Sequence, residues 1–426
     1  MRAHLALVMG LGLSSFAGAC SDPAAPPAIP HPLAKVDDHA VESGHHFGRF
    51  VAMGTSQTGG TTSGGLFSES QRQSWPAQLA RLANVEFTLP LLDGFGCPAP
   101  LIAPLELQLR VNGDSRNNTT SCSSLAPGVV LPTQNLAIFS VLTSEALFTT
   151  PEIAAAANAG VGTMYSRILP PGQTQVSAMR AQDPSYVAVE FGGVEVISTT
   201  RLGSATPAVS FAQWAPLYDQ VIAAVKAEGA RAVLVSFPNE IAIWPGLRTG
   251  AELYAERDAF AARYIIVSAT CGAAEAENLV YLPRKVFQAL AAATTAKAAG
   301  APAPILTCTD IPGTLDAVLT PTEATAANAA WALVNNYIEA TATANGFAHF
   351  SINDLFTLPD FRPTFSLQAL LTSGEPYGPY MGLDDLHPNA AGERILAEAA
   401  AKALNSVYEL HIPWQRTVVG LNRLRR

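Results

Sequence analysis

Two short segments, far apart in the sequence, carry side chains that could together perform nucleophilic catalysis. Ser56 follows a short apolar run that ends at Gly54, and a serine just beyond a buried strand can be held exposed. Near the other end of the chain, Asp384 and His387 are three residues apart. Such a carboxylate can fix the tautomer of an imidazole whose second nitrogen faces a serine hydroxyl. These residue types point to attack by serine on an ester, because a free hydroxyl barely ionises near neutral pH and needs that base.

Each segment taken alone has a simpler structural explanation. Serine beside glycine is common in turns, and Thr58 stands where a G-x-S-x-G nucleophile turn would have its second glycine. His387 could be a histidine at a loop–helix junction with a local aspartate hydrogen bond. Asp385 is a second candidate for orienting the imidazole.

The elements expected to position these residues alternate between strands and helices. Ala- and Leu-rich stretches predict helices at 216–228 and 322–345, the latter with Thr322 as its N-cap, and a further helix from after His387 to about Leu404. Strands alternating with helices predict a parallel sheet covered on both faces, with an active site at the carboxyl ends of its strands. We expect a single domain over residues 47–412. Short apolar runs predict buried strands at 49–54, 134–139, 186–191, 231–237 and 349–352.

Together the two segments resemble the SGNH/GDSL hydrolase family, with an N-terminal G-D-S-L-like block and a C-terminal D-x-x-H-P block. Residues 66–80, 96–101 and 134–137 extend the resemblance to an exported bacterial branch, over roughly residues 47–410. The resemblance implies a flavodoxin-like, three-layer α/β/α sandwich around a five-stranded parallel sheet, and hydrolysis of a small-molecule or lipid ester without metal or organic cofactor. It makes Ser56 the nucleophile, His387 the base and Asp384 the group that orients it.

Three positions depart from the family pattern. Thr55 replaces the Asp of the first block, and Ser140 stands at the Gly whose amide helps to form the oxyanion hole. Val194 occupies the place of the oxyanion Asn in the third block and has no side-chain donor, which leaves the amides of Ser56 and Ser140. Loss of one such donor lowers turnover by about 100- to 1,000-fold in another enzyme. A binding lipoprotein that keeps the fold but has weak catalysis is therefore the alternative; Asn239 is a weaker candidate to replace the missing donor.

The first residues have the form of an export signal. An apolar run after Arg2 leads to Ala17-Gly18-Ala19 before Cys20, which predicts a signal peptide over residues 1–19, too short to span a bilayer. The site also resembles a bacterial lipobox, which would lipidate Cys20 and make residues 20–46 a flexible tether. We expect an outer-membrane lipoprotein, facing the periplasm or the cell surface and attached to the membrane by its lipid. A secreted soluble protein is the alternative.

The cysteine count agrees with lipidation. Five cysteines are present, and modification of Cys20 leaves an even number for disulfide bonds in an oxidising compartment. The natural pairing joins Cys97 to Cys122 and Cys271 to Cys308, because each bond then closes a loop of modest length.

Composition argues against other functions. A net charge of −9 and a sequence pI near 5.4 disfavour nucleic-acid binding, which needs clustered Lys and Arg; the basic tail at 413–426 is too short to change this. No cysteine and histidine spacing suggests zinc, and we expect His39, His45 and His46 to be solvated. A periplasmic solute-binding protein is compatible with an exported α/β chain, but would leave the two end segments as a coincidence.

Overall fold

The computed structural model describes residues 47–414. The predictions for the signal peptide, for Cys20 and its tether, for His39, His45 and His46, and for most of the basic tail therefore lie outside the described residues. None of the helices in the described range is long and apolar enough to cross a membrane.

The strand that leads to Ser56 belongs to a parallel sheet whose neighbouring strands come from distant parts of the chain. Every residue of its first two strands is buried, as expected for a parallel sheet covered on both faces. The order of the strands in space follows their order in the sequence: β1 (Phe50–Gly54), β2 (Tyr186–Glu190), β3 (Arg231–Ser236) and β9 (Ala348–Ser351).

The run at 134–139 lies beside β1 but is not a regular strand. Backbone hydrogen bonds join it to β1, from Ala52 to Gln134, from Leu136 to Ala52 and from Ile138 to Gly54, with one parallel bridge between Ala52 and Asn135. Ser140 then adopts a positive φ of 56°, which turns the chain away from the sheet. The expected five-stranded sheet therefore consists of four regular strands and one irregular edge segment.

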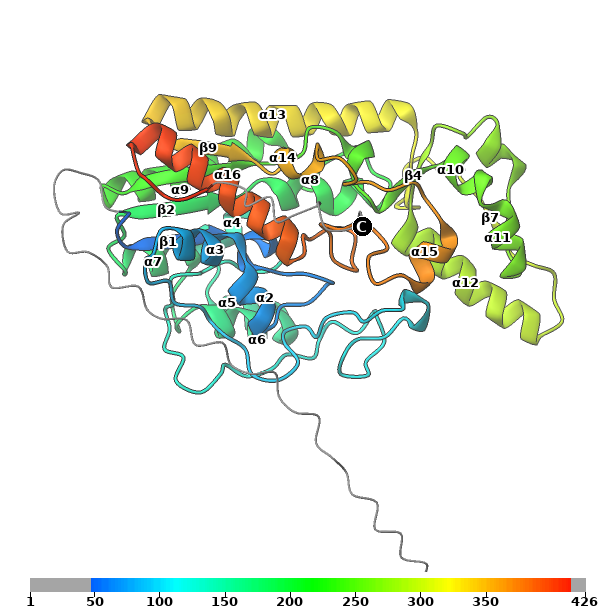
Figure 1. Ribbon diagram of the computed structural model, residues 1–426, viewed down its shortest axis with the longest axis horizontal. Coiled ribbons are helices and arrows are strands. Elements are labelled where there is room, and N and C mark those ends of the chain that lie inside the picture. The colour runs from blue at the N-terminus through cyan, green and yellow to red at the C-terminus, as the bar shows by residue number, and fades with distance from the viewer. Residues whose placement is uncertain (1–46, 415–426) are drawn as a thin grey trace, which may run out of the picture. The chain divides into compact units, whose positions relative to one another are not determined.

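Helices cover the sheet in two layers (Figure 1). Helices α3 (Trp75–Leu82) and α16 (Ala390–Tyr408) contact each other, and α16 also packs on β3 and β9. Helices α9 (Phe211–Ala227) and α13 (Pro321–Asn345) likewise contact each other and β3. The buried tryptophans Trp75, Trp214 and Trp331 come from α3, α9 and α13. The α/β/α architecture predicted from the sequence is confirmed.

Two of the predicted helix starts are wrong, for local reasons. Helix α13 begins at Pro321 with Thr320 as its N-cap, not Thr322, because Thr320 and Glu323 form a reciprocal capping box around a proline at the first helical position. Helix α9 begins at Phe211 rather than at Pro216. Ser210 and Gln213 form the capping box there.

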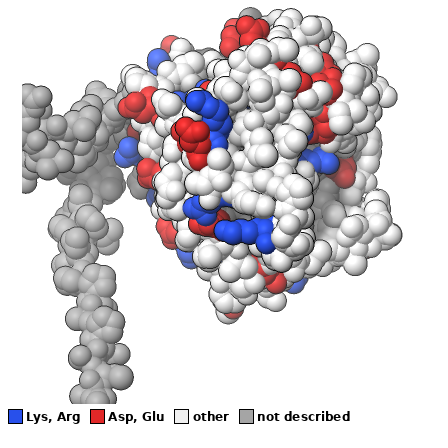
Figure 2. Space-filling model, turned by 90° about the vertical axis from the view of Figure 1, so that its right-hand side faces the viewer, with Lys and Arg blue, Asp and Glu red and all other residues white. Residues whose placement is uncertain are grey.

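Between β3 and α13 the chain builds a region that the strand pattern did not predict. It lies at the right-hand end of Figure 1, and Figure 2 shows this end as largely uncharged, with small groups of both signs. Its antiparallel strands are β4 (Leu247–Thr249), β6 (Leu279–Tyr281) and β8 (Val318–Leu319), its parallel pair is β5 (Ile266–Val267) and β7 (Ile305–Leu306), and its helices are α10 (Gly250–Ala255), α11 (Arg257–Ala262) and α12 (Leu282–Ala298).

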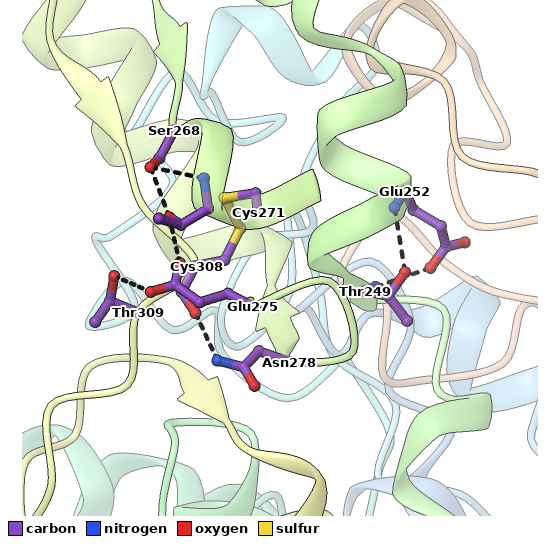
Figure 3. The surroundings of a disulfide bond; sticks show 9 residues. Thr249, Glu252, Ser268, Cys271, Glu275, Asn278, Cys308 and Thr309 are labelled. Atoms are coloured by element: carbon purple, nitrogen blue, oxygen red, sulfur yellow. Dashed lines mark hydrogen bonds between the residues drawn. A yellow bond between two sulfur atoms is a disulfide. The ribbon is translucent and has the colours of Figure 1, made fainter. Parts of the chain in front are cut away.

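Two disulfide bonds hold irregular segments in place. Cys97 is bonded to Cys122 and Cys271 to Cys308. Around the second bond, Asn278 Nδ2 donates to the carbonyl of Cys308 at 2.9 Å. The two loop segments that the disulfide joins are therefore also held by a hydrogen bond (Figure 3). Disulfides of this kind are typical of proteins that leave the reducing cytoplasm.

The remaining α-helices are short and lie in the connections between strands or, for α14 and α15, between β9 and α16. They are α1 (Ser56–Gly59), α2 (Ser68–Gln73), α4 (Thr143–Phe148), α5 (Pro151–Ala157), α6 (Ala159–Ile168), α7 (Gln175–Arg180), α8 (Gly193–Thr200), α14 (Asn353–Phe356) and α15 (Leu367–Thr372).

Candidate active site

The structure brings the segment with Ser56 and the segment with Asp384 and His387 together at the carboxyl end of the sheet. Ser56 is the first residue of α1, directly after β1, and His387 lies in the loop before α16. The Ser56 Oγ and the His387 Nε2 are 2.7 Å apart, and the His387 Nδ1 is 2.7 Å from the Asp384 Oδ2. Ser56 and His387 are only 7 % and 2 % exposed. A serine hydroxyl, an imidazole and a carboxylate thus form one continuous chain of hydrogen bonds.

The loop that carries His387 is fixed at both sides. Asn389 caps α16 by accepting the amides of Ala391 and Gly392, and the amide of Gly382 donates to the carbonyl of His387 at 2.8 Å. Gln57, next to Ser56, donates from Nε2 to the carbonyl of Leu386 at 3.2 Å. The nucleophile turn and the histidine loop therefore hold each other in position.

Asp384 is held as an anion. Its Oδ1 accepts the amides of Leu386, at 3.3 Å, and of His387, at 3.1 Å, while Oδ2 accepts the amide of Gly64 in addition to the imidazole. Burial alone would raise the pKa of this carboxyl, but the charge of His387 and these hydrogen bonds outweigh burial and lower it. Since an ionised carboxylate can only accept, the His387 Nδ1 carries a proton and Nε2 is free to accept one from Ser56.

Asp385, the rival for the orienting role, points elsewhere. It has a positive φ of 65°, is buried, and accepts a hydrogen bond from the Tyr281 hydroxyl at 3.3 Å. Burial and the neighbouring charge of Asp384 raise the pKa of Asp385 to about 8. Of the two adjacent aspartates, Asp384 contacts the imidazole.

Of the residues considered from the sequence for the oxyanion hole, Ser140 and Val194 line the pocket and Asn239 does not. Ser140 lies at the pocket with Ser56, and its φ of 56° is the left-handed conformation that glycine adopts without strain. Val194, in the first turn of α8, also lines the pocket and offers no side-chain donor there. Asn239 does not line the pocket; it is exposed and its Oδ1 accepts from the Asn335 Nδ2 at 3.1 Å. Asn239 is therefore not the replacement for the donor that Val194 lacks.

A third buried carboxyl group, which sequence reasoning missed, supports the turn that carries Ser56. Glu190, at the end of β2, is fully buried and accepts the amide of Thr55 at 2.8 Å and the Thr55 hydroxyl at 2.9 Å. Burial raises the pKa of Glu190 to about 7, against the opposing effect of these hydrogen bonds. A glutamate that closes an otherwise apolar buried strand was the signal available in the sequence.

Ser56 and His387 line a pocket of about 130 Å³. Its wall is mostly apolar, and its polar members besides the residues already described include Ser198 and Arg201 from α8, neither of which the sequence reasoning had singled out. Within residues 47–414, no group of three or more His, Cys, Asp or Glu side chains could hold a metal ion. The apolar side chains of the wall are Phe139, Val194, Ile197, Phe237, Trp244, Trp331 and Leu386.

Comparison with known proteins gives only distant structural similarity. No family model matches the sequence, and no curated protein matches it. Among solved structures, an extracellular lipase from Streptomyces rimosus is similar with 13 % identity and a TM-score of 0.32. Phospholipase A1 from Streptomyces albidoflavus NA297 is similar with 15 % identity and a TM-score of 0.33. Each match covers 84 % of this chain and 98 % of the other.

Proposed function

We propose that the protein is an exported serine ester hydrolase of the SGNH type. The observation that carries this proposal is the chain of hydrogen bonds from Ser56 through His387 to Asp384, at the mouth of a largely apolar pocket. A hydroxyl needs a base at this distance to become a nucleophile, and the base needs a partner that sets its tautomer.

In the proposed reaction, the Ser56 Oγ attacks the acyl carbonyl carbon while the His387 Nε2 takes the hydroxyl proton. The negative oxygen of the tetrahedral intermediate is stabilised by the amides of Ser56 and Ser140. The bond to the alcohol then breaks, and the alcohol leaves with the proton from His387. Water, deprotonated by His387, hydrolyses the acyl-enzyme to the free acid and restores Ser56. Asp384 stabilises the imidazolium in both halves.

The size of the pocket favours a short acyl group. Its volume of about 130 Å³ is close to that of a protein cavity of about 150 Å³ that binds benzene. An acyl chain of about four to six carbons fills such a space. We therefore expect butyrate and hexanoate esters to be better substrates than palmitate.

The test is hydrolysis of 4-nitrophenyl butyrate and 4-nitrophenyl palmitate by the purified protein, beside Ser56→Ala and a control, Ser185→Ala, at an exposed serine outside the pocket. Ser56→Ala should abolish turnover, and Ser185→Ala should leave it unchanged. A fluorophosphonate should label Ser56 in a mass spectrum. Turnover that survives in Ser56→Ala at the wild-type rate would refute the proposal.

Val194 in the pocket wall favours a second candidate, a binding lipoprotein with weak catalysis. Val194→Asn separates the two. If the missing donor limits the wild-type protein, Val194→Asn should raise kcat by at least 10-fold. The upper bound is the factor of about 100 that one such donor contributes in another enzyme. Negligible hydrolysis by both proteins would favour binding.

We also propose that Cys20 is lipidated and attaches the protein to the outer membrane. Cys20→Ala should then move the protein from the membrane fraction to the soluble fraction. A wild-type protein that is already soluble after export would favour the secreted alternative.

A further inference from the structure

Helix α8 brings two polar side chains to a pocket that is otherwise mostly apolar. Ser198 and, at the C-cap of the helix, Arg201 line the same pocket as Ser56 and His387. Val194 and Ile197 precede them on the same lining face, consistent with the spacing of three and four residues that places side chains on one side of a helix.

Arg201 is partly buried and makes few hydrogen bonds. Its Nε is buried and has no hydrogen-bond partner, and its Nη1 donates to the Tyr281 hydroxyl at 3.5 Å. None of the ion pairs between residues 47 and 414 includes Arg201. The Ser198 Oγ, one turn earlier, is also buried without a partner. Burial lowers the pKa of Arg201, but Tyr281, Asp385 and Asp384 outweigh burial and raise it, so the side chain stays a cation. Buried polar atoms without partners are unfavourable, and a cation and a hydroxyl that lack direct partners in one pocket suit an anionic ligand.

The carboxyl groups near Arg201 favour its charge but form no direct ion pair with it. Asp384 is committed to His387 and three backbone amides. Asp385 is bonded to Tyr281, and burial together with the charge of Asp384 raises its pKa to about 8, which keeps it mostly protonated at neutral pH. Arg201 itself, Arg116, Tyr281 and Tyr377 are the other titratable groups that face Asp385, and the two arginines only partly offset the rise in its pKa.

We infer that Arg201 and Ser198 bind an anionic group, a carboxylate or a phosphate, carried by the ester substrate. The inference rests on the proposed hydrolase function and adds the substrate class. A guanidinium binds either anion through two parallel N–H donors, and a serine hydroxyl can add a third. The preferred substrate is thus an ester with an apolar middle and a negatively charged end.

Helix geometry gives the length of pocket wall that α8 contributes between Val194 and Arg201. Val194 and Arg201 are seven positions apart, so their Cα atoms are about 10 Å apart along the helix. Side chains on a helix lean toward its N-terminus, which brings the guanidinium back toward the end of the pocket that Val194 lines. A charge at the end of a chain of about five carbons fits this spacing. It could belong to the acyl part, as in a dicarboxylic monoester, or to the alcohol part, as in a glycerophosphate ester.

The experiment compares kcat/KM within two matched pairs of esters. Mono-4-nitrophenyl glutarate and 4-nitrophenyl pentanoate have five-carbon acyl chains that end in a carboxylate or a methyl group. The monohexanoyl esters of glycerol 3-phosphate and of glycerol place the charge on the alcohol instead. The pair with the larger preference identifies the part of the substrate that carries the anion.

For at least one pair, we expect the wild-type protein to prefer the anionic ester by 10-fold or more, the range for a charge-assisted hydrogen bond. Arg201→Gln should reduce that preference by at least 10-fold, and Arg201→Lys should keep part of it. The control is Arg394→Gln, at a side chain that is 60 % exposed, and it should leave the preference unchanged.

Hydrolysis of the neutral esters without preference for either anionic ester would overturn the inference alone, as would an unchanged preference in Arg201→Gln. Failure to hydrolyse any of the four esters would refute the proposed function and this inference with it.

Discussion

Asp384→Asn tests the proposed triad at its most constrained position. Both carboxylate oxygens of Asp384 accept only N–H groups: Oδ2 those of His387 Nδ1 and Gly64, and Oδ1 the amides of Leu386 and His387. An asparagine side chain has one acceptor oxygen and one NH₂ group. Whichever way it turns, the NH₂ group must face two N–H donors.

The size of the effect follows from the two orientations. If the NH₂ group faces His387, the imidazole keeps a hydrogen bond only by moving its proton to Nε2, which then cannot accept from Ser56. The wrong tautomer lowers kcat by about 10⁴-fold in a serine protease triad. If the NH₂ group instead faces the amides of Leu386 and His387, two charge-assisted hydrogen bonds of about 1.5–3 kcal/mol each are lost. We therefore expect a fall in kcat of about 10³- to 10⁴-fold, or a large loss of stability.

The assay is the initial rate on 4-nitrophenyl butyrate at pH 7.5, with Ser56→Ala as the background and a urea unfolding curve for each variant. Asp385→Asn is the matched control, because it changes the adjacent carboxylate that does not contact His387. The reasoning is refuted if Asp384→Asn keeps more than about a tenth of the wild-type kcat while Asp385→Asn loses it. Asp385 would then be the orienting residue.

Three further predictions concern stability. Because the pKa of Asp385 is raised to about 8, its contribution to stability is full below the unfolded pKa of about 4 and is lost as the pH rises through about 8. Asparagine also tolerates the positive φ, so the melting temperature of Asp385→Asn, followed by circular dichroism, should fall less between pH 5 and pH 9 than that of the wild type. Equal decreases in the two proteins would contradict this. Ser140→Gly should raise the free energy of unfolding in urea by about 0.5–1 kcal/mol, because glycine adopts the left-handed conformation without strain; a lower value would show that Ser140 is not strained. Glu190→Ala should lower that free energy by about 2–5 kcal/mol, since it leaves the amide and hydroxyl of Thr55 without an acceptor. Glu190→Gln keeps an oxygen there and should cost less; equal losses would argue against this role.

Prediction from the sequence succeeded where a local pattern determines the structure. The apolar runs before Gly54 and at 186–191 are short and end at or before a glycine, with Glu190 as the one charged residue of the second, and β1 and β2 lie there. The spacing of Asp384 and His387 likewise fits a single loop, and their side chains meet in it. In both cases, residues close together in the sequence determine the local structure that was predicted.

The remaining features depend on contacts between distant residues. The run at 134–139 has strand composition, but the turn at Ser140 leaves it as an irregular edge. Arg201 is one arginine among many in the sequence, and only the folded position of α8, which packs against α13, brings it to the pocket of Ser56. The strands of the region between β3 and α13 are two or three residues long, too short for an alternating pattern to identify.

The hydrogen bond between Ser56 and His387 joins residues that are 331 positions apart. A chain is synthesised from its N-terminus, so a ribosome completes the nucleophile long before it completes the base. A growing or truncated chain that ends before Asp384 contains Ser56 without the groups that activate it. For the proposed exported hydrolase, this order means that ester cleavage would begin only after almost the whole polypeptide has been made and folded. If the proposed activity is right, the order of synthesis by itself keeps an unfinished chain from cleaving the cell's own esters.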